Sequence, residues 1–261
     1  MSILSNISWR SISVWRRNKD VFFITWKTNF LPPFLEPILY LVAMGLGFGV
    51  LIGQVAYQGN LYDYAKFLAP GLIAISSMYG AFFECTYGSF VRMHYQKTFD
   101  AIIATPLTIE DVITGEILWG ATKSFINSTI VLCVVAVAGL WDSPTFLLVP
   151  VIGFLSGLMF ASIAMMFTAL VPNIDSFNYP FFLLITPMFL FSGTFFPLTV
   201  LPGWGQELAQ LLPLTHSTTL IRDMTFGTFE IMDGVGLVYM LAVTAVTFLA
   251  AVHMMKKRLI K

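Results

Sequence analysis

Few side chains in this sequence have the types and spacing that chemistry requires. The two cysteines, Cys85 and Cys133, lie inside apolar runs, which is typical of buried thiols rather than of a disulfide or a metal pair. The histidines, His94, His216 and His253, are scattered, with no ligand spacing between them. No nucleophile–base set and no paired carboxylates occur in the apolar segments. We therefore predict no catalytic residue and no metal site, and an intramembrane enzyme is the least favoured class.

The sequence also lacks a nucleotide-binding motif. The phosphate-binding loop G-x-x-x-x-G-K-[ST] occurs nowhere, and the glycines at 45–49 (GLGFG) lack its lysine. The chain is therefore expected to bind no cofactor. If ATP drives it, a separate ATPase must hold the ATP and its magnesium ion.

One pair of opposite charges lies within long apolar segments. Glu84 precedes Arg92 by eight residues, and Lys123 lies at a similar depth in the next apolar segment. At about 1.5 Å per residue, both groups are expected about 12 Å inside the bilayer edge, where an unpaired charge is costly. We predict an intramembrane ion pair between Glu84 and Lys123. In the alternative, Lys123 extends to the interface and Glu84 is protonated or bonded to the hydroxyl of Thr122 or Ser124.

These residues belong to a chain of 261 residues that is 57% hydrophobic and only 11% charged. Soluble domains are typically about 25% charged, so the composition indicates an integral membrane protein. The formal net charge is zero, which provides no basic field for nucleic acid. The longest polar stretch is too short to bury the core of a soluble domain.

Six segments contain the roughly 20 mostly apolar residues that a membrane-crossing helix needs. They are residues 33–54, 67–90, 116–140, 146–171, 178–197 and 234–255. The predicted fold class is an all-α integral membrane protein with six transmembrane helices.

Basic residues cluster at both ends of the chain and predict its orientation. Five precede the first span, and four follow the last. Because cytoplasmic flanks are rich in Lys and Arg, both termini and the loop at 91–115 are expected in the cytoplasm. The loops at 55–66, 141–145 and 198–233 are then expected outside. The predicted location is the bacterial inner membrane.

Residues 1–30 are expected to form an N-terminal segment of their own, ahead of the six-span region at 31–261. Apolar positions and basic residues are interspersed as in an amphipathic helix that lies in the membrane interface. Trp9, Trp15 and Trp26 favour this prediction, because tryptophan prefers the headgroup level. The first apolar span begins too late for a cleavable signal peptide. The alternative is a polar tail without structure.

The predicted cytoplasmic loop is the most polar connection, and it is organised. Residues 96–104 are expected to form a short helix that Pro106 ends. Thr108, three residues before Asp111, resembles a capping signal for the third span. The helix would carry Phe99, Ile102 and Ile103 on one side and Lys97 and Asp100 on the other. Such a helix could transmit force from a soluble partner, or it could lie on the bilayer.

Three stretches of the chain resemble the permeases of type-2 ABC exporters (ABC-2 type). They are FLAPGLIAISSMYGAFFE at 67–84, FDAIIATPLTIEDVITGEILWGATKS at 99–124 and FSGTFFPLTVLP at 191–202. The resemblance extends from about residue 30 to 255 and is strongest to the nodulation-factor exporter permease (NodJ-like) group.

This resemblance implies a permease subunit that works as a homodimer with two copies of a separate P-loop ATPase. It also implies that the helix at 96–108 is the coupling helix, seated in a cleft of that ATPase. The ATPase-coupling residues expected on this basis are Gln96, Phe99, Asp100, Ile103 and Pro106.

In the family that the chain resembles, short re-entrant helices between spans five and six dip back into the outer leaflet. The residues are compatible with such an element. Pro197, Pro202 and Pro213 each interrupt a helix, while Trp204 begins an amphipathic stripe between the last two. An ordinary outer loop with interfacial helices is the alternative.

The resemblance also places the first and fifth spans near the centre of a dimer. Aromatic residues there, expected to line the transport route, are Phe34, Tyr40, Phe181, Phe189 and Phe195. Facing lipid is the alternative for each of them. Small residues recur every four positions at 45, 49 and 53 and again at 153, 157 and 161, which predicts close helix packing, within the subunit or across a dimer.

The spans contain no basic row suited to gripping a polyanion. This favours a neutral or amphipathic substrate, such as a lipid-linked or acylated oligosaccharide, and leaves export of drugs or lipids open. An ion-coupled carrier or channel would need several intramembrane carboxylates or a polar filter, whereas the spans offer chiefly Glu84 and Lys123.

Overall fold

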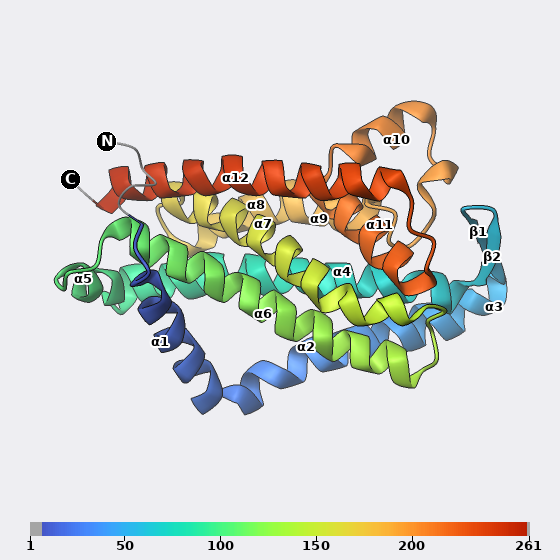
Figure 1. Ribbon diagram of the computed structural model, residues 1–261, viewed down its shortest axis with the longest axis horizontal. Helices are drawn as coiled ribbons and strands as arrows, with labels where there is room; N and C mark the ends of the chain where they lie inside the picture. Colours follow the sequence, from blue (N-terminus) through green and yellow to red (C-terminus); the bar gives the residue numbers. More distant parts are fainter. Residues whose placement is uncertain (1–6, 260–261) are drawn as a thin grey trace.

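The computed structural model describes residues 7–259, except for the side chains of residues 28–34 and 46. Within that part, six helical segments are long and apolar enough to cross a membrane, as predicted. They are Leu35–Ile52, Tyr64–Tyr95, Ile109–Val137, Pro144–Leu170, Ile174–Phe191 and Ile231–Leu259. Figure 1 shows them as an elongated bundle, with both ends of the chain and α5 at one end and α10 and the β-strands at the other.

Several of these spans are built from consecutive helical pieces. The first comprises α2 (Trp26–Tyr40), η2 (Leu41–Phe48) and α3 (Gly49–Ile52), and the second α4 (Tyr64–Phe83), η3 (Glu84–Gly88) and η4 (Val91–Tyr95). The third is α6 (Ile109–Val137), and the fourth is η5 (Pro144–Leu148) with α7 (Val149–Leu170). The fifth comprises η6 (Ile174–Phe177), α8 (Asn178–Pro180), η7 (Phe181–Ile185) and α9 (Thr186–Phe191), and the sixth is α12 (Ile231–Leu259).

The remaining elements lie at the two ends of the bundle. They are α1 (Ser11–Ile24), β1 (Gln54–Tyr57), β2 (Asn60–Asp63), α5 (Thr98–Ile103), η8 (Leu198–Val200), α10 (Gly203–Gln210) and α11 (Pro213–Phe226).

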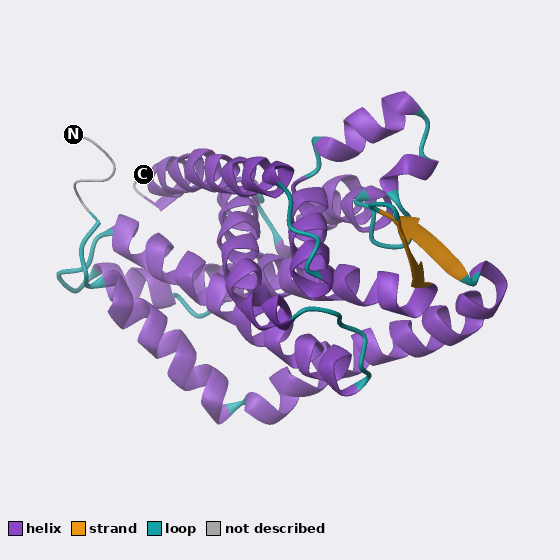
Figure 2. Ribbon diagram, turned by 45° about the vertical axis from the view of Figure 1, so that its right-hand side comes forward, coloured by secondary structure: helices purple, strands orange, loops and turns teal. Residues whose placement is uncertain are grey.

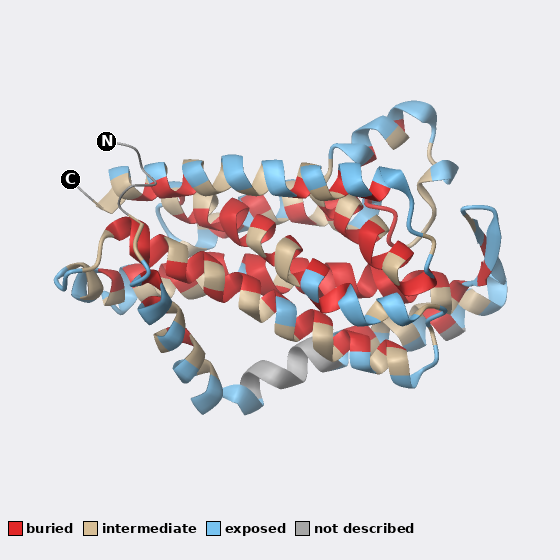
Figure 3. Cartoon of the chain, viewed as in Figure 1, coloured by how far each residue is buried: buried red, intermediate tan, exposed pale blue. Residues whose placement is uncertain are grey.

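The second, third and fourth spans form the centre of the molecule. In their most apolar windows, 89% of the second span is buried, against 12% of the first and 22% of both the fifth and the sixth. Figure 3 shows the same contrast, with buried residues concentrated on α4, α6 and α7. The first, fifth and sixth spans therefore carry the faces that are open to lipid or to another chain.

Small residues allow α6 and α7 to approach closely. A side chain at Gly153 or Gly157 would collide with Ser128 or Ser124, at 2.2 and 2.5 Å. The hydroxyl of Ser124 donates to the carbonyl of Ser77 on α4 at 2.6 Å, so that a serine contact joins a third helix to this pair. The small-residue seam of the fourth span thus packs within the subunit, one of its two predicted uses.

The seam of the first span, which consists of the small residues at 45, 49 and 53, is packed less closely. A Cβ at Gly45 would approach Ala65 to 3.1 Å, whereas one at Gly49 or Gly53 would meet no atom within 4 Å among the described residues. Most of this seam is therefore unoccupied within the subunit.

An antiparallel hairpin of β1 and β2 follows the first span, where only an outer loop was predicted. Val55 pairs with Tyr62, and the turn between the strands uses left-handed backbone at Gln58 and Gly59. The ring of Tyr62 stacks on Phe226 of α11, with ring centres 4.1 Å apart. Figure 2 shows the hairpin beside α3.

Two short helices, α10 and α11, occupy the stretch between the fifth and sixth spans, and Pro202 and Pro213 lie at their starts as predicted. Helix α11 is largely buried among the spans. On α10, Ala209 faces inward, whereas Trp204 is 69% exposed, so the predicted apolar stripe points away from the protein.

Candidate coupling site and transport route

Helix α1 packs along α6 rather than standing free. A side chain at Gly115 would lie 2.6 Å from Val14 and 2.7 Å from the carbonyl of Ser11, so α1 crosses α6 where α6 has no side chain. Nearby, the indole nitrogen of Trp15 donates to the hydroxyl of Thr122 at 2.8 Å. Residues Ser11–Ile24 of the N-terminal segment are therefore helical, and one face of this helix packs against the bundle.

The structure brings the predicted pair Glu84 and Lys123 together. The Lys123 ammonium lies 2.8 Å from Oε2 of Glu84, and the Arg92 guanidinium lies 2.8 Å from its other oxygen, Oε1. Glu84 therefore holds two cations, where the sequence had suggested one.

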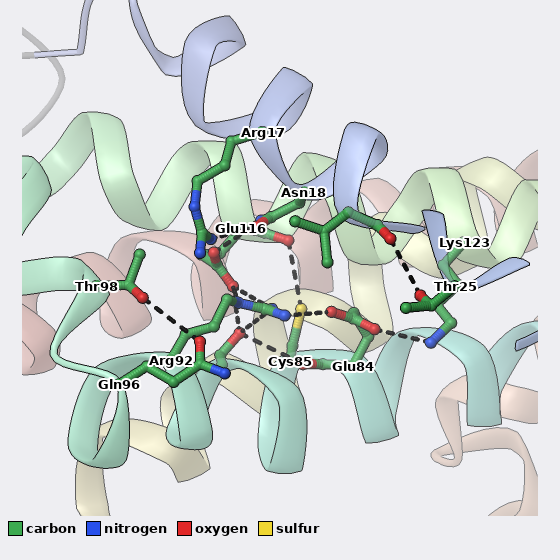
Figure 4. A network of polar contacts seen from close by, with 12 residues as sticks. Arg17, Asn18, Thr25, Glu84, Cys85, Arg92, Gln96, Thr98, Glu116 and Lys123 are labelled. Carbon is green, nitrogen blue, oxygen red and sulfur yellow. Dashed lines mark hydrogen bonds and ion pairs between the residues drawn. The ribbon is translucent and has the colours of Figure 1, made fainter. Parts of the chain in front are cut away.

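A second carboxylate completes this arrangement. Glu116 of α6 lies 2.5 Å from Nη2 of Arg92, and it accepts from the Ser89 hydroxyl at 2.6 Å. Its other oxygen accepts from the side-chain amide of Asn18 at 2.8 Å. We refer to Asn18, Glu84, Ser89, Arg92, Glu116 and Lys123 as the charge network (Figure 4).

The charge network joins α1, the end of the second span and the start of the third. Its two carboxylates and two cations balance, which is how buried charges are tolerated. The sequence contained a signal for the missing members. Glu84 and Arg92 are two turns apart on one helix, and Glu116 and Lys123 are two turns apart on its antiparallel neighbour. Lys123 therefore falls level with Glu84, and Arg92 level with Glu116, which gives two successive pairs of opposite charge.

The coupling loop differs from its prediction in length and in orientation. The backbone at Lys97 is left-handed (φ 55°), so α5 begins at Thr98 rather than at Gln96, which is exposed ahead of it, and ends at Ile103. Phe99 is completely buried in the core of its own chain. The ring therefore anchors α5 to its own bundle, and a role for Phe99 in coupling stays a prediction.

The other predicted coupling residues divide into two groups. Asp100 and Pro106 are exposed, whereas Ile103 is half-buried against the core. Asp100 lies 4.0 Å from the Lys97 ammonium, and both side chains face solvent. The loop thus presents charged side chains to solvent.

The N-terminal segment holds the end of this loop. Thr108 and Asp111 form the predicted capping box, and Asp111 also accepts from the backbone nitrogen of Ser8 at 2.7 Å. Arg10 donates to the carbonyl of Pro106 at 2.9 Å. Any displacement of the loop must therefore act on the segment leading into α1.

The last turns of α12 fasten to the same end of the bundle. Lys256 lies 2.7 Å from Glu110 at the start of α6. Arg258 donates to the carbonyls of Thr168 and Val171, both at 2.6 Å, where α7 ends. A cation at the carboxyl end of a helix satisfies carbonyls that lack helical partners.

Aromatic rings form a continuous row between the second and fifth spans. The rings of Tyr79 and Phe189 stack at 6.2 Å, Phe83 and Phe181 lie at 5.7 Å, and the Tyr87 ring contacts Phe177 at 5.1 Å. We define the aromatic row as Phe195, Phe189, Tyr79, Phe181, Phe83, Tyr87, Phe177 and Phe90, in which each ring lies within 6.5 Å of the next.

The row contains three of the five predicted route residues, Phe181, Phe189 and Phe195. Tyr40 contacts the last two, at 6.1 and 6.4 Å, while the side chain of Phe34 lies outside the described residues. The second-span members were missed, although Tyr79, Phe83 and Tyr87 recur every four residues, the spacing of one helix face.

A polar cluster lies at the opposite end of the bundle, beneath the hairpin. Arg222 of α11 is buried over the ring of Phe67, 4.0 Å from its centre, and donates to the carbonyl of Gly193 at 2.8 Å. The neighbouring Asp223 accepts from the hydroxyls of Tyr57 at 3.0 Å and Thr228 at 2.9 Å.

The Asp223 carboxyl has an unusually high pKa. Burial, reinforced by the negative charge of Asp233, raises the pKa of Asp223 to about 7. The chain therefore carries a carboxyl that changes charge near neutral pH, at the end of the bundle away from the charge network.

Comparison with known proteins identifies the family. Residues 7–226 match the ABC-2 type transporter family. The chain belongs to this family. Among its relatives, Nodulation protein J of Rhizobium meliloti (strain 1021) is 37% identical over 96% of this chain and 94% of its own length. Nodulation protein J of Rhizobium leguminosarum bv. viciae is 40% identical over 83% and 82% of the two chains.

A more distant relative is the inner membrane transport permease YadH of Escherichia coli (strain K12). It is 23% identical over 85% of this chain and 83% of its own length. The predicted resemblance is confirmed, and so is the six-span all-α fold class. The chain is a multi-pass membrane subunit of an ABC-2 type transporter, in a family of transport subunits rather than of catalysts.

Proposed function

We propose that this chain is the permease subunit of an ATP-driven exporter in the bacterial inner membrane. It would work as a homodimer, and two copies of a separate P-loop ATPase would supply the energy. The observation that carries this proposal is the construction of the loop at 97–108, in which a short helix, anchored by Phe99 and followed by Pro106, presents Asp100 to solvent.

The contacts behind the loop support a coupling role. The capping box of Thr108 and Asp111 binds the N-terminal segment through Ser8, and the charge network joins α1 to the two spans that flank the loop. A displacement of α5 would therefore be transmitted to α1 and to the second and third spans through these hydrogen bonds and ion pairs. A loop lying passively on lipid would not need this bracing.

The substrate we propose is amphipathic and contains sugar, such as a lipid-linked or acylated oligosaccharide. Sugars stack on aromatic faces, acyl chains also lie against them, and the aromatic row offers such faces along the length of two spans. Phe83 is 40% exposed, and Tyr79, Phe181 and Phe189 are partly exposed, so the row is not sealed within the subunit. In a dimer joined at the first and fifth spans, it would lie beside the central route.

An ion-coupled mechanism is less compatible with these contacts. A carboxylate that carries ions must release its partner, whereas Glu84 and Glu116 are both held by Arg92. The charge network therefore resembles a brace more than an ion pathway.

The test is co-purification with a P-loop ATPase encoded beside this chain. We expect the two to form a complex, and Asp100→Lys to weaken it about fivefold or more, because charges at an interface rim govern association. Asp20→Lys is the matched control, since Asp20 is an exposed carboxylate beside a lysine, on α1. Absence of a complex, or equal weakening by both substitutions, would refute the coupling role of α5.

A further inference from the structure

We propose that the cytoplasmic end of this chain holds one anionic phospholipid of the surrounding bilayer, with its phosphate at Arg17 and an acyl chain against Phe22, Phe23 and Trp26. Two adjoining cavities, one charged and one apolar, lie under the bend between α1 and α2.

The first cavity lies between α1 and the charge network and has a volume of about 390 Å³. Its charged lining consists of three cations, Arg17, Arg92 and Lys123, and one carboxylate, Glu84. Glu84 and Glu116 together balance Arg92 and Lys123, so the positive charge left over in the lining is that of Arg17. A cavity of this size and sign suits a compact anionic headgroup.

Arg17 is the cation left over. Its guanidinium donates to Oδ1 of Asn18 at 3.1 Å, and no described carboxylate lies within ion-pair distance of it. Partial burial, together with the positive charge of Arg92, lowers the pKa of Arg17, and the negative charge of Glu116 offsets part of this effect. Figure 4 shows its guanidinium directed toward Arg92 and Glu116. A phosphate bound here would accept from unused guanidinium donors and would offset the repulsion between two arginines.

The second cavity is apolar and adjoins the first at Phe22, which lines both. It has a volume of about 440 Å³ and is lined by Phe22, Phe23, Trp26 and Ile126. Phe23 and Trp26 are about half exposed, which places aromatic surface beside an arginine at the depth where α1 meets the first span. A charged cavity joined to an apolar one matches a phospholipid, in which a phosphate is attached to acyl chains.

The charge of α1 favours an anionic lipid over a zwitterionic one. Four basic residues lie on or just before this helix, against one acidic residue, Asp20. The basic residues are Arg10, Arg16, Arg17 and Lys19. Basic residues near a membrane surface each contribute about fivefold to the binding of anionic lipid. Because several cations attract lipid without a defined site, the test must separate Arg17 from its neighbours.

The experiment measures lipid retention by the purified full-length chain, using native mass spectrometry with phosphatidylglycerol and phosphatidylethanolamine of identical acyl chains. We expect preferential retention of one phosphatidylglycerol per chain, and a loss of affinity of about fivefold or more in Arg17→Gln. The control is Arg16→Gln, which removes the same charge from an exposed position one residue away. Equal losses in both variants, or equal retention of the two lipids by the wild type, would overturn the site.

A second measurement uses the wild-type chain alone, in case Arg17→Gln does not fold. Trp119 lines the charged cavity and Trp26 the apolar one, so phosphatidylglycerol with brominated acyl chains should quench their fluorescence more than the brominated zwitterionic lipid does. Glycerol phosphate, which has the headgroup without acyl chains, should fail to reverse this quenching. Reversal by glycerol phosphate would show a phosphate site without an acyl site and would refute the lipid.

Discussion

Arg92 explains why four charges can lie together inside this membrane protein. Removing a charged group from water costs several kcal/mol, and only close partners recover that cost. Arg92 is 2.8 Å from Glu84 and 2.5 Å from Glu116, while Lys123 occupies the remaining oxygen of Glu84. Each charge thus has at least one opposite charge in direct contact, and two of these three ion pairs converge on a single guanidinium.

Removing Glu84 should therefore cost more than removing Lys123. Glu84→Gln deprives two cations of a partner, and we expect it to lower the free energy of unfolding by about 3–5 kcal/mol. Lys123→Gln should cost less, because Glu84 keeps Arg92 and the Lys123 side chain is 18% exposed. The double variant should lose less than the sum by about 0.5–3 kcal/mol. Unfolding of the purified chain in detergent measures all three.

The exposed pair Lys66 and Asp142 provides the control. Its partners are 23% and 40% exposed, so Lys66→Gln should cost no more than about 1 kcal/mol. Strictly additive losses at Glu84 and Lys123, or a loss at Lys66 as large as theirs, would contradict a brace made of buried charges.

Asp223 gives the outer end of the chain a dependence on pH. Because its pKa rises to about 7 in the folded protein, the folded state binds an extra proton from about pH 4 to pH 7. The contribution of Asp223 to the free energy of unfolding is therefore fully present at acid pH, and it is lost as the pH rises through about 7. Asp223→Asn keeps an oxygen that can accept from Tyr57 and Thr228 but cannot ionise.

We therefore expect Asp223→Asn to gain thermal stability relative to the wild type as the pH is raised from 5 to 8. The measurement is the difference between the two melting temperatures at each pH. A constant difference would show that Asp223 has an ordinary pKa. If Asp223→Asn instead becomes less stable than the wild type at pH 8, the charged form of Asp223 is the stabilising one.

Helix α1 illustrates how an element's position follows from one missing side chain. A methyl group at Gly115 would lie 2.6 Å from Val14 and 2.7 Å from a backbone oxygen of Ser11, which cannot move without α1. We expect Gly115→Ala to displace α1 and to destabilise the chain by about 1–3 kcal/mol. Trypsin should then cut faster at Arg16 and Lys19.

The control for this change is Gly234→Ala. A Cβ at Gly234 of α12 meets no described atom within 4 Å, so this substitution should leave both stability and the cleavage rate near their wild-type values. If Gly115→Ala behaves in the same way, α1 is not held by this crossing.

Among the elements, those specified by local signals were predictable and those specified by packing were not. Prolines at 202 and 213 marked the starts of α10 and α11, and the capping box marked α6, because each acts on its own turn of helix. The left-handed residue Lys97 and the burial of Phe99 depend on how the loop folds back on the bundle. No spacing within the loop reveals that.

At the scale of the molecule, six spans follow from apolar length alone, and the part of the chain that the structure describes contains six. Length did not reveal where the second span ends. Its helix continues to Tyr95 because Arg92, which reads as a loop residue, is neutralised by Glu116 from a different span. The hairpin of β1 and β2 was missed for a similar reason, since its rings pack on α11, far away in sequence.

The arrangement of the two ends makes the orientation testable. Helix α1, α5 and the last turns of α12 lie at one end, and the hairpin and α10 lie at the other (Figure 1). Basic residues are concentrated at the first end, so we predict that this end faces the cytoplasm. Lys97 and Glu207 are exposed, one at each end, and report on this directly.

In a background without Cys85 and Cys133, Glu207→Cys should react with a membrane-impermeant maleimide in intact cells. Lys97→Cys should react only after the membrane is permeabilised. Both positions are exposed, so a difference in labelling reflects the side of the membrane rather than burial. The reverse pattern would invert the molecule and place α5 beyond the reach of any cytoplasmic ATPase. The coupling proposed for Asp100 would then fall with the orientation, whereas the contacts of the charge network would stand, because they lie within one chain.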